Sequence, residues 1–407
     1  MVSIKKNILF ITSANLAANP RLVKELRLAV DKGFAATVIQ CWVGNWSDAG
    51  TDQLKSEFPS VLFFERSTLR KPLMPWLIST VIERVCRLLP FSLLTDKLLS
   101  FAVSKRSYLL LHEIKKINTS FQWVIAHNPA AFYPAMIAAE KSGALLGIDV
   151  EDYHPGETND PGTVHLMKEL MRKVLPTAAY CSFASPLIQK YTEHDIPAID
   201  RGRSKVVNNI FPANEFLMPP PEVNRNRKLK FTWFSQFIDY GRGLEKLLPV
   251  FDRFADSVEC TLIGFARDGF LKNELLHRSY ITCIPSMSQL ELHQQLPHYD
   301  IGLAVEDRQA DVNRNICLTN KIWAFFQAGL YIMATDTDAQ KTFLQQYPLH
   351  GELISADQDK AIQTIESLIS RKEEILAGKP ARYKNAEQFS WEQEAEILSS
   401  EWDKNYR

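Results

Sequence analysis

Cationic and amide side chains gather around one predicted helix start in the second half of the chain. Thr319 is suited to cap a helix that ends at Gly329, and Asn320 and Lys321 fall in its first turn. Free amide groups and the positive end of the helix dipole attract a phosphate, and Lys321 adds a point charge. The polar residues 313–315 would supply further donors from the preceding loop. The alternative is an ordinary strand-and-helix unit whose lysine lies in solvent.

A second cation lies between two glycines in an earlier predicted loop. Gly243 would let the backbone approach a ligand closely, and Arg242 beside it could hold two phosphate oxygens at once. Together with Lys321 it would place cations from two loops on one diphosphate. One arginine flanked by glycines is weak evidence by itself.

Polar side chains also follow two predicted strands of the first half, 123–126 and 144–150. His127 follows the first strand. The second strand is followed by Glu151, Asp152 and His154. Residues just past the carboxyl ends of parallel strands face a ligand crevice, so we expect these groups at such a crevice. The alternatives are a structural histidine and a metal site, but spacing places no further metal ligand.

The loop after the first predicted strand offers two more candidates for contact with an acceptor. Asn19 can cap a helix that has Pro20 at its first position, and Arg21 lies just inside it. Either residue could contact an acceptor, or Asn19 could simply cap while Arg21 is solvated. The spaced glycines of a dinucleotide-binding loop are absent, which argues against bound NAD or FAD.

The elements that must position these residues alternate between strand and helix, which predicts an α/β protein with parallel sheets. The 407 residues, 46% hydrophobic and 23% charged, are enough for two domains. Lysine plus arginine and aspartate plus glutamate both total 47, so nothing global indicates nucleic acid as a partner. The six cysteines have no paired spacing and are expected to be reduced. No stretch is long enough to cross a bilayer.

Composition sets the expected domain limits. They are a first domain 1–210, a proline-rich linker 211–228, a second domain 229–385 and a closing segment 386–407. Within the first domain, 69–106 combines apolar residues at helical spacing with seven cations and two carboxylates. Such a helical pair could lie on an anionic membrane, or it could be an insertion whose basic face is in water.

The motifs together resemble the bacterial glycosyltransferases of family four. They are ITSANLAANPRLVKE, VIAHN with DVEDYHPGE, FPANEF, FSQFIDYGRGLE, and CLTNKIWAFFQAGLYIMATDT followed by FSWE. The resemblance runs through nearly the whole chain. It implies the GT-B fold, in which two Rossmann-like domains face each other across a crevice and a C-terminal helix crosses back to the first domain. It also implies that the second domain binds a nucleotide-sugar donor and the first domain an acceptor.

By this resemblance, Arg242 and Lys321 would steady the donor diphosphate and His127 would touch the donor sugar. Further donor contacts are expected from Ser235, Gln236, Gly243, Glu306, Asn315, Thr319 and Asn320. Acceptor contacts are expected from Asn19, Arg21, Glu151, Asp152 and His154. The family's arginine in the first donor loop is replaced by Ser235 and Gln236, and its pair of glutamates is missing, which puts the identity of the donor in doubt.

The resemblance implies sugar transfer to a glycan or lipid-linked acceptor, with retention at the anomeric carbon and without metal or other cofactor. The expected setting is surface polysaccharide or glycoconjugate synthesis in the cytoplasm, with contact to the inner face of the membrane through 69–106. Two alternatives remain. One is a nucleotide-sugar epimerase of the same fold, and the other is a non-catalytic sugar-binding or scaffold protein.

Overall fold

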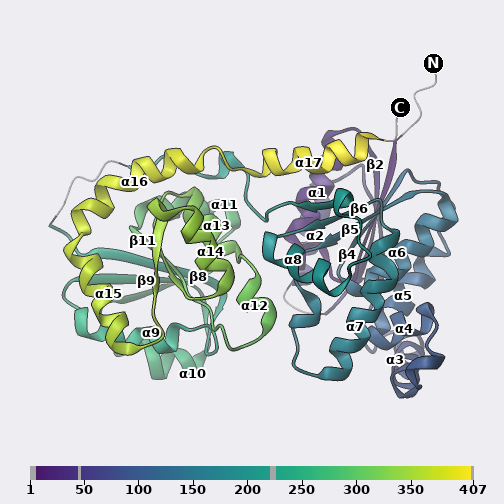
Figure 1. Cartoon of the computed structure of the whole chain (residues 1–407), viewed down its shortest axis with the longest axis horizontal. Coiled ribbons are helices and arrows are strands. Elements are labelled where there is room, and N and C mark those ends of the chain that lie inside the picture. Colours follow the sequence, from purple (N-terminus) through teal and green to yellow (C-terminus); the bar gives the residue numbers. More distant parts are fainter. Residues whose placement is uncertain (1–5, 45–46, 221–225, 405–407) are drawn as a thin grey trace. The chain divides into compact units, whose positions relative to one another are not determined.

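The computed structural model describes residues 6–44, 47–220 and 226–404. The chain divides into two compact units. Unit 1 comprises Met1–Asn208 with Ala395–Arg407, and unit 2 comprises Asn209–Glu394. Each unit contains one parallel sheet with helices on both sides of it (Figure 1). The predicted α/β architecture of two Rossmann-like units is therefore confirmed.

Unit 1 is built on seven parallel strands in the order β3-β2-β1-β4-β5-β6-β7. The strands are β1 Asn7–Thr12, β2 Ala35–Trp42, β3 Leu62–Ser67, β4 Trp123–His127, β5 Leu145–Val150, β6 Tyr180–Phe183 and β7 Ser204–Val206. The central strands are continuous buried runs, as expected of a sheet covered on both faces. From β1 the chain winds to β2 and β3 on one side of the sheet and then crosses to β4 on the other side. A crevice is therefore expected at the carboxyl ends of β1 and β4.

The helices of unit 1 begin where the sequence provides caps. Asn19 accepts a hydrogen bond from the amide of Leu22, and Ser185 does the same for Ile188. The helices are α1 Pro20–Asp31, α2 Ser47–Ser56, α3 Leu73–Leu88, α4 Asp96–Val103, α5 Lys105–Ile114, α6 Pro129–Ser142, α7 Pro161–Val174 and α8 Pro186–Asp195. The predicted helical pair within 69–106 is in fact α3, α4 and the first residues of α5.

Unit 2 has six parallel strands in the order β10-β9-β8-β11-β12-β13. They are β8 Leu229–Ile238, β9 Val258–Ala266, β10 Ile281–Ile284, β11 Ile301–Ala304, β12 Tyr331–Thr335 and β13 Gly351–Ile354. The direction of winding changes between β8 and β11, which is where a ligand crevice is expected. Strand β8 continues past an irregularity between Phe234 and Phe237.

The helices of unit 2 are α9 Leu244–Phe251, α10 Asp268–Phe270, α11 Gln289–Gln295, α12 Val312–Ile316, α13 Asn320–Gln327, α14 Asp338–Gln346, α15 Gln358–Ser370 and α16 Lys372–Ala386. The loop expected before α13 is partly helical, because Asp311 caps α12. Helix α13 lies close against β11. A Cβ atom at Gly302 would come within 2.2 Å of the ring of Phe325, so only glycine allows this approach.

Helix α17, Trp391–Asp403, begins in unit 2 and ends in unit 1. In unit 1, Trp402 is fully buried, and its indole nitrogen donates to the hydroxyl of Tyr180 at 3.0 Å. The backbone oxygen of Trp402 accepts from the indole of Trp123 at 3.1 Å. The C-terminal segment thus returns to the first unit, as the predicted fold requires.

The predicted linker 211–228 does not stand free along its whole length. Phe211 and Phe216 are buried in unit 2, and their rings lie 6.3 Å apart. Residues 221–225 lie outside the described part of the chain. All six cysteines are free thiols, as expected.

Candidate active site

Lys321 lies at the start of α13 in unit 2 and is almost fully buried. Its ammonium is 3.1 Å from a carboxylate oxygen of Glu306 and 5.4 Å from the ring centre of Trp233. The alternative that this lysine is solvated is therefore wrong. Glu306 was expected to contact the donor, but in the structure its carboxylate accepts a hydrogen bond from Lys321.

The first backbone amides of α13 donate no hydrogen bond to a capping side chain. Thr319 occupies the capping position but makes no side-chain hydrogen bond to the helix, and its hydroxyl is buried without a partner in the described residues. Asn320 is exposed, and its amide oxygen accepts from Asn209 at 3.0 Å. The first amide groups of α13 are therefore available to an anion.

Arg242 and Gly243 form the loop between β8 and α9. Gly243 has φ +86°, and a Cβ atom there would lie 3.6 Å from the side chain of Val305 and 3.8 Å from the backbone of Glu306. The loop thus lies against the end of β11. Within the described part of the chain, Arg242 is half-buried and forms no hydrogen bond or ion pair. Two cationic residues, Arg242 and Lys321, therefore belong to loops and helix starts at the carboxyl edge of the unit 2 sheet, where its winding changes direction.

Two further predictions for the donor side need correction. Asn315 is engaged by helix α14, because its amide nitrogen donates to Asp338 at 2.7 Å and its oxygen accepts from the Asp338 backbone at 3.0 Å. It therefore orders α12 against α14. Ser235 and Gln236 were expected in a loop but lie within β8 at its irregularity, where the strand bends.

Unit 1 contains a buried network of charged side chains centred on Arg21. The guanidinium lies 3.1 Å from Glu25 and 3.0 Å from Asp149, and it donates to the backbone oxygen of Val207 at 2.6 Å. Asp149 also accepts from the hydroxyl of Ser182 at 2.5 Å. Arg21 is fully buried, so the prediction that it contacts an acceptor is wrong.

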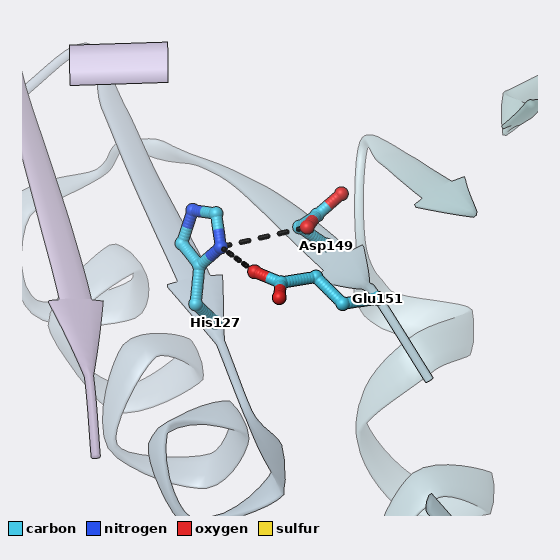
Figure 2. Close-up of side chains that lie close together, drawn as sticks. All are labelled: His127, Asp149 and Glu151. Atoms are coloured by element: carbon cyan, nitrogen blue, oxygen red, sulfur yellow. Dashed lines mark hydrogen bonds and ion pairs between the residues drawn. The ribbon is translucent and has the colours of Figure 1, made fainter. Parts of the chain in front are cut away.

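His127 joins this network from the end of β4 (Figure 2). Its Nδ1 atom is 3.2 Å from Glu151 and 3.5 Å from Asp149, and its Nε2 atom is 3.3 Å from Glu25. The imidazole is fully buried, so it does not present itself to a sugar as predicted. Glu151, whose side chain is 18% exposed, is the member of the group in Figure 2 that reaches solvent.

Burial and charge oppose each other in this network. Burial disfavours the charged ring of His127, but the negative charge of Glu25 and the other carboxylates outweigh it, so the pKa of His127 lies well above 6.5. Burial and the neighbouring charge of Asp149 raise the pKa of Glu151. The pKa of Asp149 falls to about 2 despite burial, because Arg21 stabilises its carboxylate.

These shifts predict that unit 1 loses stability as the pH rises above neutrality. A histidine whose pKa is raised by folding stabilises the folded state fully at pH values below its unfolded pKa. This stabilisation is lost as the pH rises through the folded pKa. The raised pKa of Glu151 changes stability in the same direction. Urea unfolding between about pH 6 and about pH 9 should show a fall of up to about 1.4 kcal/mol per pH unit. A flat profile would contradict a protonated His127.

The remaining acceptor-side candidates are mostly enclosed. Asn19 is buried and caps α1. His154 is buried, lies 3.1 Å from Glu157 and packs on Phe132. Asp152 is half-buried, and its backbone oxygen accepts from the amide of His154 at 2.9 Å. The predictions that Asn19 and His154 face an acceptor are therefore not supported by their positions.

His127, Asp149 and Glu151 could each offer one ligand atom to a metal, and these atoms lie within 4.8 Å of one another. The surroundings do not fit a cation well. The guanidinium of Arg21 lies 3.0 Å from Asp149, so a positive charge already stands beside the group and would repel a metal cation. The absence of a metal from the reaction stays a prediction.

Asn128 follows His127 and has an unusual backbone. Its φ is 70° and its ψ 145°, a region that residues other than glycine rarely adopt, and its side chain accepts from the hydroxyl of Thr12 at 2.9 Å. Strain of this kind is often found at functional sites. Here it lies at the carboxyl end of β4, beside the end of β1.

Substitutions at Asn128 test this strain. Alanine and glycine both remove the bond to Thr12, but only glycine also relieves the backbone. We therefore expect Asn128→Gly to be more stable than Asn128→Ala by about 1 to 3 kcal/mol in thermal unfolding. Equal stability of the two variants would show that the position is not strained.

Three members of the network were not predicted from the sequence: Glu25, Asp149 and Ser182. Two signals were available. Glu25 follows Arg21 by one helical turn, and Asp149 interrupts an otherwise apolar predicted strand. A buried acid in a strand requires a buried partner, which would have directed attention to Arg21.

Solved structures of similar fold support the architecture. HepE of Anabaena, solved in complex with UDP and glucose, has a TM-score of 0.65 at 13% identity over 97% of this chain and 98% of its own. A glycosyltransferase of Rickettsia africae has a TM-score of 0.63 at 13% identity over 99% and 100% of the two chains. TarM has a TM-score of 0.63 at 9% identity over 99% of each chain.

At these identities the likeness concerns the fold alone. No family model and no curated protein matches the chain. The two parallel sheets, the returning helix α17 and these structural neighbours together show that the chain has the GT-B fold found in glycosyltransferases.

Proposed function

We propose that this protein is a glycosyltransferase that moves a sugar from a nucleotide-sugar donor to a glycan or lipid-linked acceptor. The observation that carries the proposal is the carboxyl edge of unit 2. There the uncapped start of α13, the buried Lys321 and Arg242, which has no partner among the described residues, lie where the winding of the sheet changes direction. Helix amides and two cations are the groups that hold a diphosphate.

The same groups account for the chemistry. When the bond to the sugar breaks, negative charge grows on the outer phosphate of the leaving nucleoside diphosphate. Fixed donors stabilise that charge without rearranging, and each can be worth about 3 kcal/mol of barrier. Lys321 is held in place by Glu306 and Trp233, so little movement is needed at the moment of transfer.

Unit 1 contributes the acceptor side in this proposal, with Glu151 as the contact. It is the partly exposed carboxylate of the network, and the buried His127 orients it from behind at 3.2 Å. A carboxylate at this position can accept a hydrogen bond from an acceptor hydroxyl and so orient it toward the donor. His127 then acts as a positioning residue.

Further features of the proposal come from the resemblance in sequence. They are retention at the anomeric carbon, with a donor phosphate oxygen taking part in deprotonation, no metal, and a place in surface polysaccharide or glycoconjugate synthesis. The cytoplasm and the inner membrane face, reached through 69–106, are the proposed location. Uridine diphosphate sugars are the first donors to try, because HepE structures hold UDP and UDP-glucose.

The test is donor turnover in the absence of acceptor. The purified protein should release nucleoside diphosphate slowly from one class of nucleotide sugar, and Arg242→Ala should lower that rate about 100-fold. Conversion of one donor sugar into another without diphosphate release would overturn the proposal in favour of an epimerase. No turnover of any donor would favour a binding or scaffold protein.

A further inference from the structure

Helix α3 turns its apolar side to solvent. Six large apolar residues recur at the spacing of one helix face and are all exposed: Met74, Leu77, Ile78, Val81, Val85 and Leu88. The exposed fraction reaches 61% at Met74 and 85% at Leu88. Helix α3 lies at the periphery of unit 1, outside α5 and α6 (Figure 1). In a surface helix of an ordinary globular protein this stripe would face the core.

The opposite side of α3 is polar and packed inward. Ser79 and Cys86 are buried, and the carboxylate of Glu83 accepts from the backbone amide of Lys105 at 3.1 Å. The guanidinium of Arg87 donates to the backbone oxygen of Ala102 at 2.8 Å. Because these contacts fix the rotation of the helix, the apolar stripe cannot turn inward without breaking them.

The apolar surface continues past the end of α3. In the turn that follows, Phe91 and Leu93 are 44% and 60% exposed. Together with the six residues of the stripe they form what we call the α3 surface. None of the helices in the described part of the chain is long and apolar enough to span a bilayer. The α3 surface therefore suits a position at an interface, as in amphipathic helices that lie on a membrane.

Charge around the α3 surface favours an anionic partner. Exposed cations flank it at Arg70, Lys71, Arg84 and Lys97. Of the two carboxylates in 69–106, Glu83 is turned inward and Asp96 lies 3.8 Å from Lys173. A second copy of the chain would bring the same cations against each other in a symmetric pair, whereas anionic lipid head groups would neutralise them.

We propose that the α3 surface docks unit 1 onto an anionic lipid bilayer. Its apolar side chains would enter the head-group region while the flanking cations meet lipid phosphates. The docking itself does not depend on catalysis. What docking means for the substrate does rest on the proposed function. The guanidinium of Arg106, just after α4, donates a hydrogen bond to the backbone oxygen of Ser13 at 3.0 Å. Ser13 lies in the loop after β1. The docked surface is thus tied to the edge where an acceptor is expected, and the acceptor would be lipid-linked.

The test is sedimentation of the full chain with vesicles. The wild type should bind vesicles of phosphatidylcholine containing about one third phosphatidylglycerol, and should bind pure phosphatidylcholine and high-salt samples weakly. The triple variant Met74→Glu, Val81→Glu and Leu88→Glu should bind at least about tenfold less. The matched control places the same three charges on exposed leucines of unit 2, at Leu276, Leu290 and Leu349, and should bind like the wild type.

The outcomes separate docking from catalysis. Absence of binding by the wild type, or equal loss in both triple variants, would overturn the docking proposal. A wild-type dimer in solution that the α3 variant dissociates would also overturn it, because a second copy would then be the occupant. Both variants should retain the release of nucleoside diphosphate from soluble donor, so failure of the proposed function would be seen independently of vesicle binding.

Discussion

Lys321→Ala is expected to lower the release of nucleoside diphosphate from a nucleotide sugar by about 100- to 1,000-fold, corresponding to the loss of one fixed donor to the leaving phosphate. Lys321 lies in the first turn of α13, 3.1 Å from Glu306, and is 8% exposed. The measurement is the steady-state rate at saturating donor. Most of the loss should appear in kcat, because the charge on the leaving group develops in the transition state.

Two further variants keep this prediction distinct from simple unfolding. Removing Lys321 leaves Glu306 buried without its cation, so the double variant Lys321→Ala with Glu306→Gln should recover thermal stability but not turnover. Lys341→Ala, at an exposed lysine of helix α14, should leave the rate unchanged. Wild-type turnover in Lys321→Ala would show that the lysine has no part in catalysis.

Arg21→Met is expected to destabilise unit 1 by about 3 to 5 kcal/mol, because it removes the guanidinium that pairs with the buried carboxylates Glu25 and Asp149 and leaves both beside a single imidazole, His127. The measurement is urea or thermal unfolding at neutral pH. Lowering the pH should recover part of the loss, since protonation removes the unpaired charge. In the wild type the pKa of Asp149 is about 2, so protonation of Asp149 itself adds no stability in mild acid.

The matched control lies on the same helix. Arg27 is 49% exposed and pairs with Glu57 at 2.9 Å, so Arg27→Met should cost no more than about 1 kcal/mol. If Arg21→Met cost as little as Arg27→Met, the buried network would not be the stabilising element of unit 1 that its distances indicate.

The fold could largely be predicted from local signals. Apolar runs such as Asn7–Thr12 form buried parallel strands, and Asn19 caps a helix that has Pro20 at its first position, as predicted. The start of α13 could also be predicted, because Thr319, Lys321 and Gly329 are close in the sequence. The burial of Lys321 and its ion pair could not be predicted, because its partner Glu306 comes from the end of another strand.

The network in unit 1 could not be predicted in the same way. Its contacts join residues far apart in the chain, such as Arg21 with Asp149, and which side chains are enclosed depends on how the sheet is covered. Sequence position at a strand end directed attention to His127 and Glu151, whose side chains lie 3.2 Å apart in the structure. It could not show that the imidazole is buried and that only the carboxylate reaches solvent.

Helix α3 shows a related limit. The positive excess and helical spacing of 69–106 were visible in the sequence, but the pattern is the same whether the apolar stripe faces inward or outward. The orientation of α3 is fixed by contacts of its polar side, such as the hydrogen bond that Glu83 accepts from the amide of Lys105.

The most direct test of the central claim, a diphosphate site at the carboxyl edge of unit 2, is a thermal-shift series with nucleoside diphosphates and their sugars. A ligand at ~100 times its dissociation constant stabilises the folded state by about 2.7 kcal/mol. One nucleoside diphosphate and its sugars should raise the melting temperature, Arg242→Ala should abolish the shift, and Arg253→Ala, at an exposed arginine of the same unit, should retain it. No shift with any nucleotide, or a shift that survives Arg242→Ala undiminished, would contradict the assignment.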